Sequence, residues 1–298
     1  MFKHILVPLD GSRMAEAALP VAASLARTLK ASVMLLHVIE SDAPEQVHSE
    51  RHLTAPGEAE AYLAETASRA FEAGIQVEWH VHTAAVDNVP ASLVEHAEEL
   101  KPDLMVMCAH GGGRMRDRLF GNIAQQVISR GVTPVLMLQP EKPSDAPFQL
   151  KKILVPLDDK SIHDQSLLYA RDLAGLYQAE IYMLTVIPTL GTLPGEEAAT
   201  GSLLPSTTAA MLDIEQETAR EHIRTHLDEL RQSGFDAKAE VARGDTAATI
   251  TETANRTGAD LIILSTHRRA GLGAFWERSV TPMVARKTKI PLLLIPLK

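Results

Sequence analysis

Glycines and arginines gather directly after an apolar segment, Leu104 to Ala109, that we predict to be a strand. Gly111 to Gly113 follow it, then three arginines, and Gly121-Asn122 opens a predicted helix. Glycines leave backbone N–H groups accessible, a helix N-terminus carries partial positive charge, and arginines add full charge. This spacing indicates a phosphate cradle. The alternative is a plain glycine turn beside a solvated basic face made of Arg114, Arg116 and Arg118.

A carboxylate follows the first predicted strand in each half of the chain. Asp10, in the segment Pro8-Leu9-Asp10-Gly11-Ser12, has its counterpart in Asp158, in the segment Pro156-Leu157-Asp158-Asp159-Lys160. The carboxyl ends of parallel strands meet at one edge of a sheet, and doubly wound proteins bind their ligands there. We therefore expect Asp10 to lie beside the glycine segment, with a turn or helix cap as its other reading.

Cysteine and histidine add reactive groups near the same place. Cys108, the only cysteine, ends the predicted strand before the glycines, and we interpret it as a small buried hydrophobe rather than a nucleophile. His110 and His267 occupy the same position in the two halves, where each could contact a ligand or hold the loop.

Two further pairs of histidines have spacings that suit metal ions. His80 and His82 share one face of a predicted strand, and His222 and His226 share one face of a predicted helix. Neither pair has a clear third ligand in the sequence, so we predict no metal site.

The predicted strands and helices that position these residues occur twice along the chain, as a sequence repeat. Lys3 to Asp10 returns as Lys151 to Asp158, and Thr133 to Leu138 matches Ile290 to Ile295. Each copy has the size of a domain rather than of a solenoid unit. We predict two domains, residues 1–140 and 150–298, joined by a short proline-rich linker.

Apolar runs alternate with amphipathic stretches in both halves. Segments such as Val33 to Ile39 are apolar on both faces, as in strands of a buried parallel sheet. Ala15 to Leu29 and Val89 to Leu100 carry helical stripes. The alternation predicts an α/β protein with two doubly wound parallel sheets. Pro188 to Ala210, rich in Gly, Pro, Ser and Thr, is predicted to be a long surface loop.

Composition narrows the functional class. The formal net charge of −9 argues against general affinity for nucleic acid, and a single cysteine fits a reducing compartment. The N-terminus has no signal-peptide pattern, and no apolar run approaches the roughly 20 residues that span a bilayer. We expect a cytoplasmic protein without nucleic-acid or membrane partners.

Both halves resemble universal stress proteins almost end to end. The resemblance rests on the openings ILVPLDGS and ILVPLDD, on LLHVIE and MLTVIP, on KPDLMVMCAHGGG and GADLIILSTHRRA, and on the strands after Pro134 and Pro291. It implies five strands per half in the order 3-2-1-4-5, as in adenine nucleotide alpha hydrolase-like proteins. It also implies that Val135 to Leu138 pairs antiparallel with Leu292 to Ile295, which makes a pseudo-twofold monomer. Further assembly into a homodimer stays open.

The ATP-binding branch of this family has the pattern G-x-x-G-x9-G-(S/T) after its fourth strand. The first half keeps the spacing as Cys108-x-x-Gly111-x9-Gly121-Asn122, whereas the second reads Ser265-x-x-Arg268-x9-Arg278-Ser279. An arginine fills the space through which a phosphate would reach the backbone. The resemblance thus implies ATP or AMP in the first half and a degenerate second site, whose arginines either bind a smaller anion or fold onto carboxylates. The implied binding residues are Pro8, Leu9, Asp10, Val38, Cys108, His110, Gly111, Gly121, Asn122 and Ile123.

Three functions follow as hypotheses. The first is a non-catalytic regulator of the stress response that binds an adenine nucleotide or another small anionic ligand. In the second, nucleotide binding is vestigial and the protein acts through another small ligand or a protein partner. The third is a weak ATPase or a related nucleotidyl transferase, but the transferase signatures are missing and no catalytic triad can be inferred.

Overall fold

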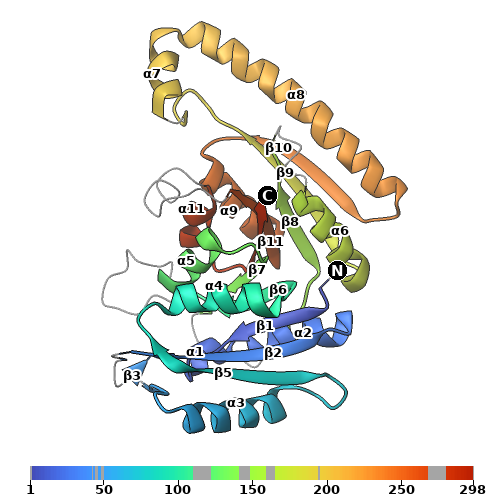
Figure 1. Cartoon of the computed structure of the whole chain (residues 1–298). Helices are drawn as coiled ribbons and strands as arrows, with labels where there is room; N and C mark the ends of the chain where they lie inside the picture. Colours follow the sequence, from blue (N-terminus) through green and yellow to red (C-terminus); the bar gives the residue numbers. More distant parts are fainter. Residues whose placement is uncertain are drawn as a thin grey trace.

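The computed structural model describes residues 2–41, 43, 46–47, 50–109, 122–140, 148–158, 165–193, 195–267 and 280–297. The N-terminal half contributes the strands β1 (His4–Pro8), β2 (Ser32–Glu40), β5 (Val77–Val86), β6 (Leu104–Cys108) and β7 (Val135–Leu138). The C-terminal half contributes β8 (Lys152–Pro156), β9 (Glu180–Ile187), β10 (Ala237–Arg243), β11 (Leu261–His267) and β12 (Leu292–Leu297). These strands form one sheet in the order β10-β9-β8-β11-β12-β7-β6-β1-β2-β5 (Figure 1).

The predicted strand order and the predicted junction between the halves are confirmed. Each half has the order 3-2-1-4-5 with parallel neighbours, and β7 pairs antiparallel with β12. Leu136 lies opposite Leu293, with Met137 facing Leu292 and Val135 facing Leu294. Two apolar edge strands, each of which would expose unpaired backbone groups alone, therefore cover one another.

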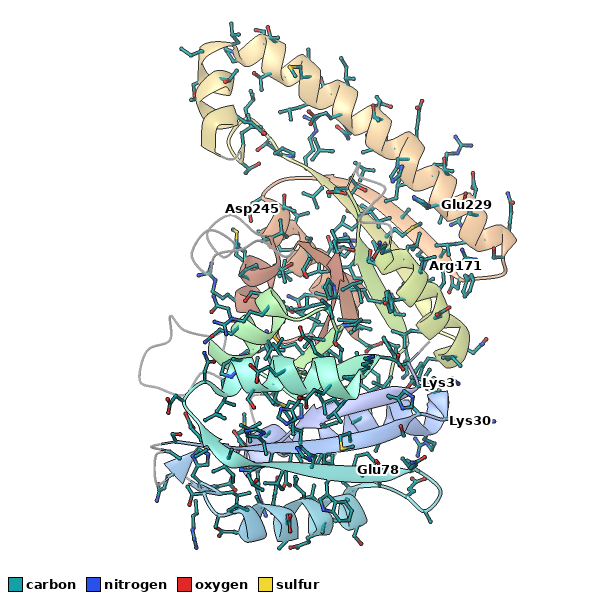
Figure 2. All side chains as sticks on the ribbon, in the orientation of Figure 1. Lys3, Lys30, Glu78, Arg171, Glu229 and Asp245 are labelled. Atoms are coloured by element: carbon teal, nitrogen blue, oxygen red, sulfur yellow. The ribbon has the colours of Figure 1, made fainter. Side chains whose placement is uncertain are left out.

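Helices cover both faces of this sheet (Figure 1). One face carries α2 (Leu19–Leu29), α3 (Pro56–Ala70), α6 (Gln165–Tyr177) and α8 (Pro205–Gln232), and the other carries α4 (Val89–Leu100), α5 (Asn122–Arg130), α9 (Thr246–Thr257) and α11 (Val280–Lys287). Successive strand residues go to opposite cores: Ile5 and Ile153 to the first, Leu6 and Leu154 to the second. Because both faces of inner strands such as β1 and β8 are buried, these strands read as continuous apolar runs, whereas the edge strands β5 and β10 carry polar residues. Side chains fill both layers (Figure 2).

The repeated sequence produces repeated contacts. The Asp103 carboxylate accepts hydrogen bonds from the backbone N–H groups of Lys3 and His4, at 2.6 and 3.0 Å. Asp260 does the same for Lys151 and Lys152, at 2.8 and 2.9 Å. In both halves this carboxylate ties the start of the first strand to the start of the fourth, which sets their register.

The helix predicted over Ala15 to Leu29 is wrong in one respect, because it is broken into α1 (Arg13–Glu16) and α2. Pro20 lies in the first turn of α2. A proline lacks an N–H and its ring collides with the carbonyl four residues earlier, so it is accommodated in a first turn rather than inside a helix.

The surface loop predicted over Pro188 to Ala210 is also wrong, since most of it is helical. It contains α7 (Gly195–Leu203) and the beginning of α8, which extend beyond the end of the sheet (Figure 1). Gly195 and Pro205, which suggested a loop, stand at helix starts. Further along, α8 buries Leu212, Ala219, Ile223 and Leu230. None of the helices in the described parts of the chain is long and apolar enough to cross a membrane.

Candidate functional site

The carboxyl ends of β1, β2 and β6 meet at one edge of the sheet. β1 lies between the other two strands, and the Leu9 N–H beyond it donates to the Leu36 carbonyl at 2.8 Å. On the other side, the Ala109 N–H beyond β6 donates to the Leu138 carbonyl at 2.8 Å. The chain leaves β1 toward β2 but later returns to β6 on the opposite side. This reversal of strand order is where doubly wound sheets place ligands.

Asp10 is half-buried and organises the turn after β1. Its Oδ1 accepts hydrogen bonds from the N–H and the hydroxyl of Ser12, at 2.9 and 2.7 Å. The Ser12 hydroxyl oxygen in turn accepts from the Ala15 N–H at 3.2 Å and caps α1. The turn-holding reading of Asp10 is thus present in the structure, and one carboxylate oxygen is engaged in it.

Cys108 lies close to Asp10 although the two are far apart in sequence. Burial raises the pKa of the Cys108 thiol to about 12, and the Asp10 carboxylate adds to the shift. A thiol with this pKa stays protonated at neutral pH, whereas a nucleophilic cysteine must be a thiolate. This agrees with the interpretation of Cys108 as a small hydrophobe.

Val38 presents backbone rather than side chain to this edge. Its side chain is only 7% exposed and packs in the core beneath α4. Directly after it the pairing of β2 with β5 shifts, because Val38 lies opposite His82 but Glu40 lies opposite Val86. Irregular pairing of this kind is common beside functional sites. In the C-terminal half, β9 and β10 pair without a shift to Ile187 and Arg243.

The segment around Leu53, which the sequence analysis did not single out, packs against the same turn. It follows the hairpin of β3 (Gln46–Val47) and β4 (Glu50–Arg51), whose Glu50 carboxylate accepts a hydrogen bond from the Arg13 N–H at 2.6 Å. His37, 1% exposed, has Nδ1 2.8 Å from the Leu9 carbonyl and Nε2 3.1 Å from the Leu53 carbonyl. One signal could have revealed His37: it is a lone imidazole inside the apolar run LLHVIE.

Several predicted site residues lie outside the described residues. These are His110, Gly111 and Gly121 in the N-terminal half, and Arg268, Arg278 and Ser279 in the C-terminal half. Asn122 is the first residue of α5, and Ile123 beside it is 43% exposed. The structure thus brings together Pro8, Leu9, Asp10, Val38 and Cys108. Asn122 and Ile123 form the start of α5, which follows β6 in the chain.

The equivalent edge of the C-terminal half keeps part of this arrangement. Asp158 is half-buried after β8, and the Leu157 N–H donates to the Leu184 carbonyl at 2.8 Å. Asp245 caps α9 by accepting from the Ala248 N–H at 2.8 Å. The buried Thr185 stands where His37 stands in the first half, so the imidazole that bridges the Leu9 and Leu53 carbonyls has no counterpart in the described part of this half.

Two other features of the molecule, a histidine pair and a groove, lie away from this edge. His222 and His226 meet edge to face on α8 with ring centroids 4.7 Å apart, but within the described ranges no third ligand gathers with them. A groove of about 650 Å³ between the halves includes none of the predicted site residues. Its lining includes Val21, Leu138, Pro140, Asn255, Lys287 and Pro291.

Comparison with known proteins decides the family. The sequence model of the universal stress protein family matches residues 1–139 and again residues 149–296. The chain belongs to this family. A universal stress protein of Synechocystis sp. is 32% identical over 141 residues, which is 46% of this chain and 86% of that protein. One from Methanocaldococcus jannaschii is 28% identical over 151 residues, 48% of this chain and 85% of that protein.

Solved structures of similar fold extend over the whole chain. A universal stress protein from Archaeoglobus fulgidus DSM 4304 has a TM-score of 0.66 at 15% identity, covering 99% of this chain and 96% of that chain. A functionally unknown protein from Pseudomonas aeruginosa PAO1 has a TM-score of 0.69 at 18% identity, covering 99% and 93%. At these identities the likeness concerns the fold. The tandem universal stress protein predicted from the motifs is confirmed.

Proposed function

We propose that this universal stress protein is a non-catalytic regulator that binds one adenine nucleotide, ATP or AMP, in its N-terminal half, residues 1–140. One observation carries the proposal. Asp10, Cys108 and the backbone beyond Val38 meet where the strand order reverses. In the sequence, the glycine-rich segment directly follows β6, the strand that ends at this edge with Cys108.

Each proposed contact has a chemical reason. The adenine would lie against the backbone near Val38, since its side chain is packed away in the core. The Asp10 carboxylate is a hydrogen-bond acceptor at this edge and suits sugar hydroxyl groups, and N–H groups of the glycines and of the α5 start suit phosphates. The proposed binding set is Pro8, Leu9, Asp10, Val38, Cys108, His110, Gly111, Gly121, Asn122 and Ile123.

The C-terminal half, residues 150–298, is proposed to bind no triphosphate nucleotide. Arg268 and Arg278 stand in the sequence where the first half has Gly111 and Gly121. The β9–β10 pairing runs without the shift that follows Val38. Fixed positive charge in a smaller space favours a smaller anion, or carboxylates of the protein itself.

Calorimetric titration of the full-length chain with ATP, ADP and AMP tests this proposal. We expect one nucleotide per chain, abolished by Gly121→Arg. Arg278→Gly is the matched control at the equivalent position of the other half, and it should leave the stoichiometry at one. Two equal sites per chain would contradict the asymmetry.

A correctly folded chain that binds none of the three nucleotides would overturn the proposal. It would then favour action through another small ligand or a protein partner. Mass spectrometry of ligand retained through purification distinguishes these cases, and an ATP turnover assay tests for weak hydrolysis. The single cysteine and the acidic charge favour a cytoplasmic place of action without nucleic acid, which cell fractionation would test.

A further inference from the structure

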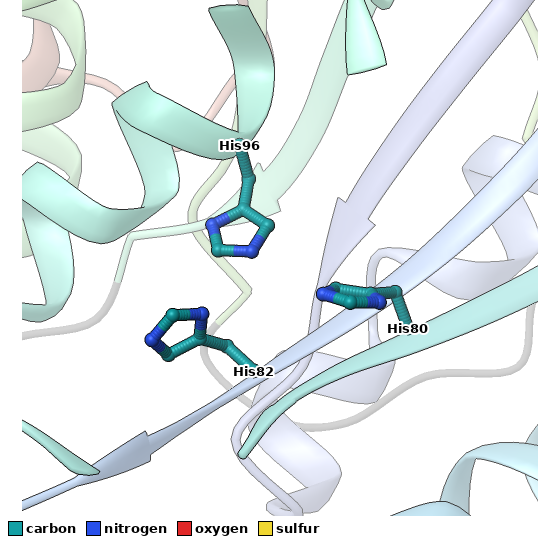
Figure 3. Close-up of side chains that lie close together, drawn as sticks. All are labelled: His80, His82 and His96. Carbon is teal, nitrogen blue, oxygen red and sulfur yellow. The ribbon is translucent and has the colours of Figure 1, made fainter. Parts of the chain in front are cut away.

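Three histidines from two elements converge on the face of the sheet that α4 covers. His80 and His82 are alternate residues of β5, and His96 lies on α4 (Figure 3). The ring centroid of His96 is 5.2 Å from that of His80 and 4.9 Å from that of His82. One nitrogen from each ring lies within 4.8 Å of the other two. His96 supplies the third imidazole that the sequence analysis lacked.

We propose that His80, His82 and His96 bind a divalent transition-metal cation of the zinc type. Zinc bonds to imidazole nitrogen are about 2.0–2.1 Å long, which puts the nitrogens of a tetrahedral site about 3.3 Å apart. The nitrogens here lie within 4.8 Å of one another, so they need to approach by up to about 1.5 Å. Rotation of the imidazole side chains would bring the nitrogens closer, since the three rings already point into one shared space (Figure 3).

His96 is held in a ligating orientation by its own helix. Its Nδ1 lies 2.8 Å from the Ser92 carbonyl, one turn earlier. A carbonyl can only accept, so Nδ1 carries the hydrogen and Nε2 keeps its lone pair. Metal-binding histidines commonly use their second nitrogen in this way, which fixes both the tautomer and the ring plane.

The three histidines differ in their exposure to solvent, so an ion could reach the site from the side of His80. His80 is exposed, His82 is half-buried and His96 is 6% exposed. Partial desolvation of the His80 ring lowers its pKa, and its two histidine neighbours lower it further, against the opposing effect of Glu99. A lowered pKa favours the neutral ring, which is the form that binds metal. The fourth coordination position is left for water or an external ligand.

The C-terminal half closes the equivalent space in a different way. By strand register, Glu240 stands where His80 stands and Ala242 where His82 stands. Thr253 of α9 takes the place of His96. There Arg256 pairs with Glu240, which also accepts a hydrogen bond from Tyr182 at 2.7 Å. In the C-terminal half an ion pair therefore links α9 to the edge strand β10. In the N-terminal half a metal ion would link α4 to the edge strand β5. This predicts one metal per chain, independent of nucleotide binding.

The test is calorimetric titration of ZnCl2 into full-length protein that has been stripped with a chelator. We expect one saturable site per chain at pH 7.5. His80→Asn and His82→Asn should each weaken it by at least about 10- to 100-fold, because loss of a direct ligand costs no less than loss of an outer partner. The double variant His222→Asn, His226→Asn removes another histidine pair and should leave this site unchanged.

Thermal unfolding gives a second readout of the same site. Zinc should raise the unfolding midpoint of the natural chain, since the ion binds only the folded arrangement, and should not raise that of His80→Asn. His80 is exposed, so its replacement leaves the fold intact, and circular dichroism checks this. Absence of a stoichiometric site, or equal zinc affinity in the natural chain and both single variants, would overturn the proposal.

Discussion

Gly11→Ala tests how the turn after β1 is built. Gly11 has a φ of +88°, and a Cβ on it would lie 2.8 Å from Cγ and 2.9 Å from Cδ1 of Leu53. Leu53 is 9% exposed and its carbonyl faces His37, so it has little room to withdraw. The left-handed backbone should cost an alanine about 1–2 kcal/mol. The contact with Leu53 should add about 1–3 kcal/mol.

Gly74→Ala is the matched control. Gly74 has a φ of +105°, and no atom lies within 4 Å of the position of its added Cβ. Gly74→Ala should therefore lower the free energy of unfolding only through its left-handed backbone, by about 1–2 kcal/mol. The difference between the two variants, about 1–3 kcal/mol, measures the contact with Leu53. Urea unfolding followed by circular dichroism gives both values as changes in the free energy of unfolding.

Leu53→Ala completes the experiment. If the clash is with Leu53, combining this change with Gly11→Ala should destabilise by about 1–3 kcal/mol less than the sum of the two single changes. Nucleotide binding should weaken in Gly11→Ala, since the displaced turn carries Asp10. Equal destabilisation by Gly11→Ala and Gly74→Ala, together with additivity in the double variant, would refute the reasoning.

Three further predictions concern the core and the edges of the sheet. Burial raises the pKa of Glu180, but its contacts with Lys238 and Lys152 outweigh burial and lower it below 4.5. Its contribution to stability is therefore complete above pH 4.5 and is lost as the pH falls through the lowered value. Glu180→Gln should cost about 1–2 kcal/mol at pH 7 and flatten this acid dependence, as urea titrations at several pH values would show. Leu293 is 1% exposed at the junction of the halves, so Leu293→Ala should lower the free energy of unfolding by about 2–5 kcal/mol in the same assay. A decrease below about 1 kcal/mol would contradict the buried junction. Cys108, half-buried and with its pKa raised to about 12, should resist Ellman's reagent at pH 8 until the chain is unfolded in urea; fast labelling of the native chain would contradict the raised pKa.

Much of the fold could be predicted from sequence because the decisive patterns are local or repeated. Ile5 to Val7 and Ile153 to Val155 are apolar at every position, and a strand buried on both faces requires this. The repeat of the opening and closing segments indicated two copies of one domain. The edge that carries Asp10 and Cys108 followed from the rule that parallel strands end together. The antiparallel pairing of β7 with β12 came from the family resemblance, since no local pattern specifies which edges meet, and the register that places Leu136 opposite Leu293 came from the structure.

Only the tertiary structure decided the remaining contacts. Pro205 favours both loops and helix starts, and the burial of Leu212 and Ala219 beside Ile187 of β9 favours the helix α8. Nothing in the sequence places His96 beside His80. Their meeting depends on which face of β5 turns toward α4 and on the rotation of that helix about its axis. Both are set by packing on the shared core, because a one-residue change of register would turn the strand histidines to the opposite face.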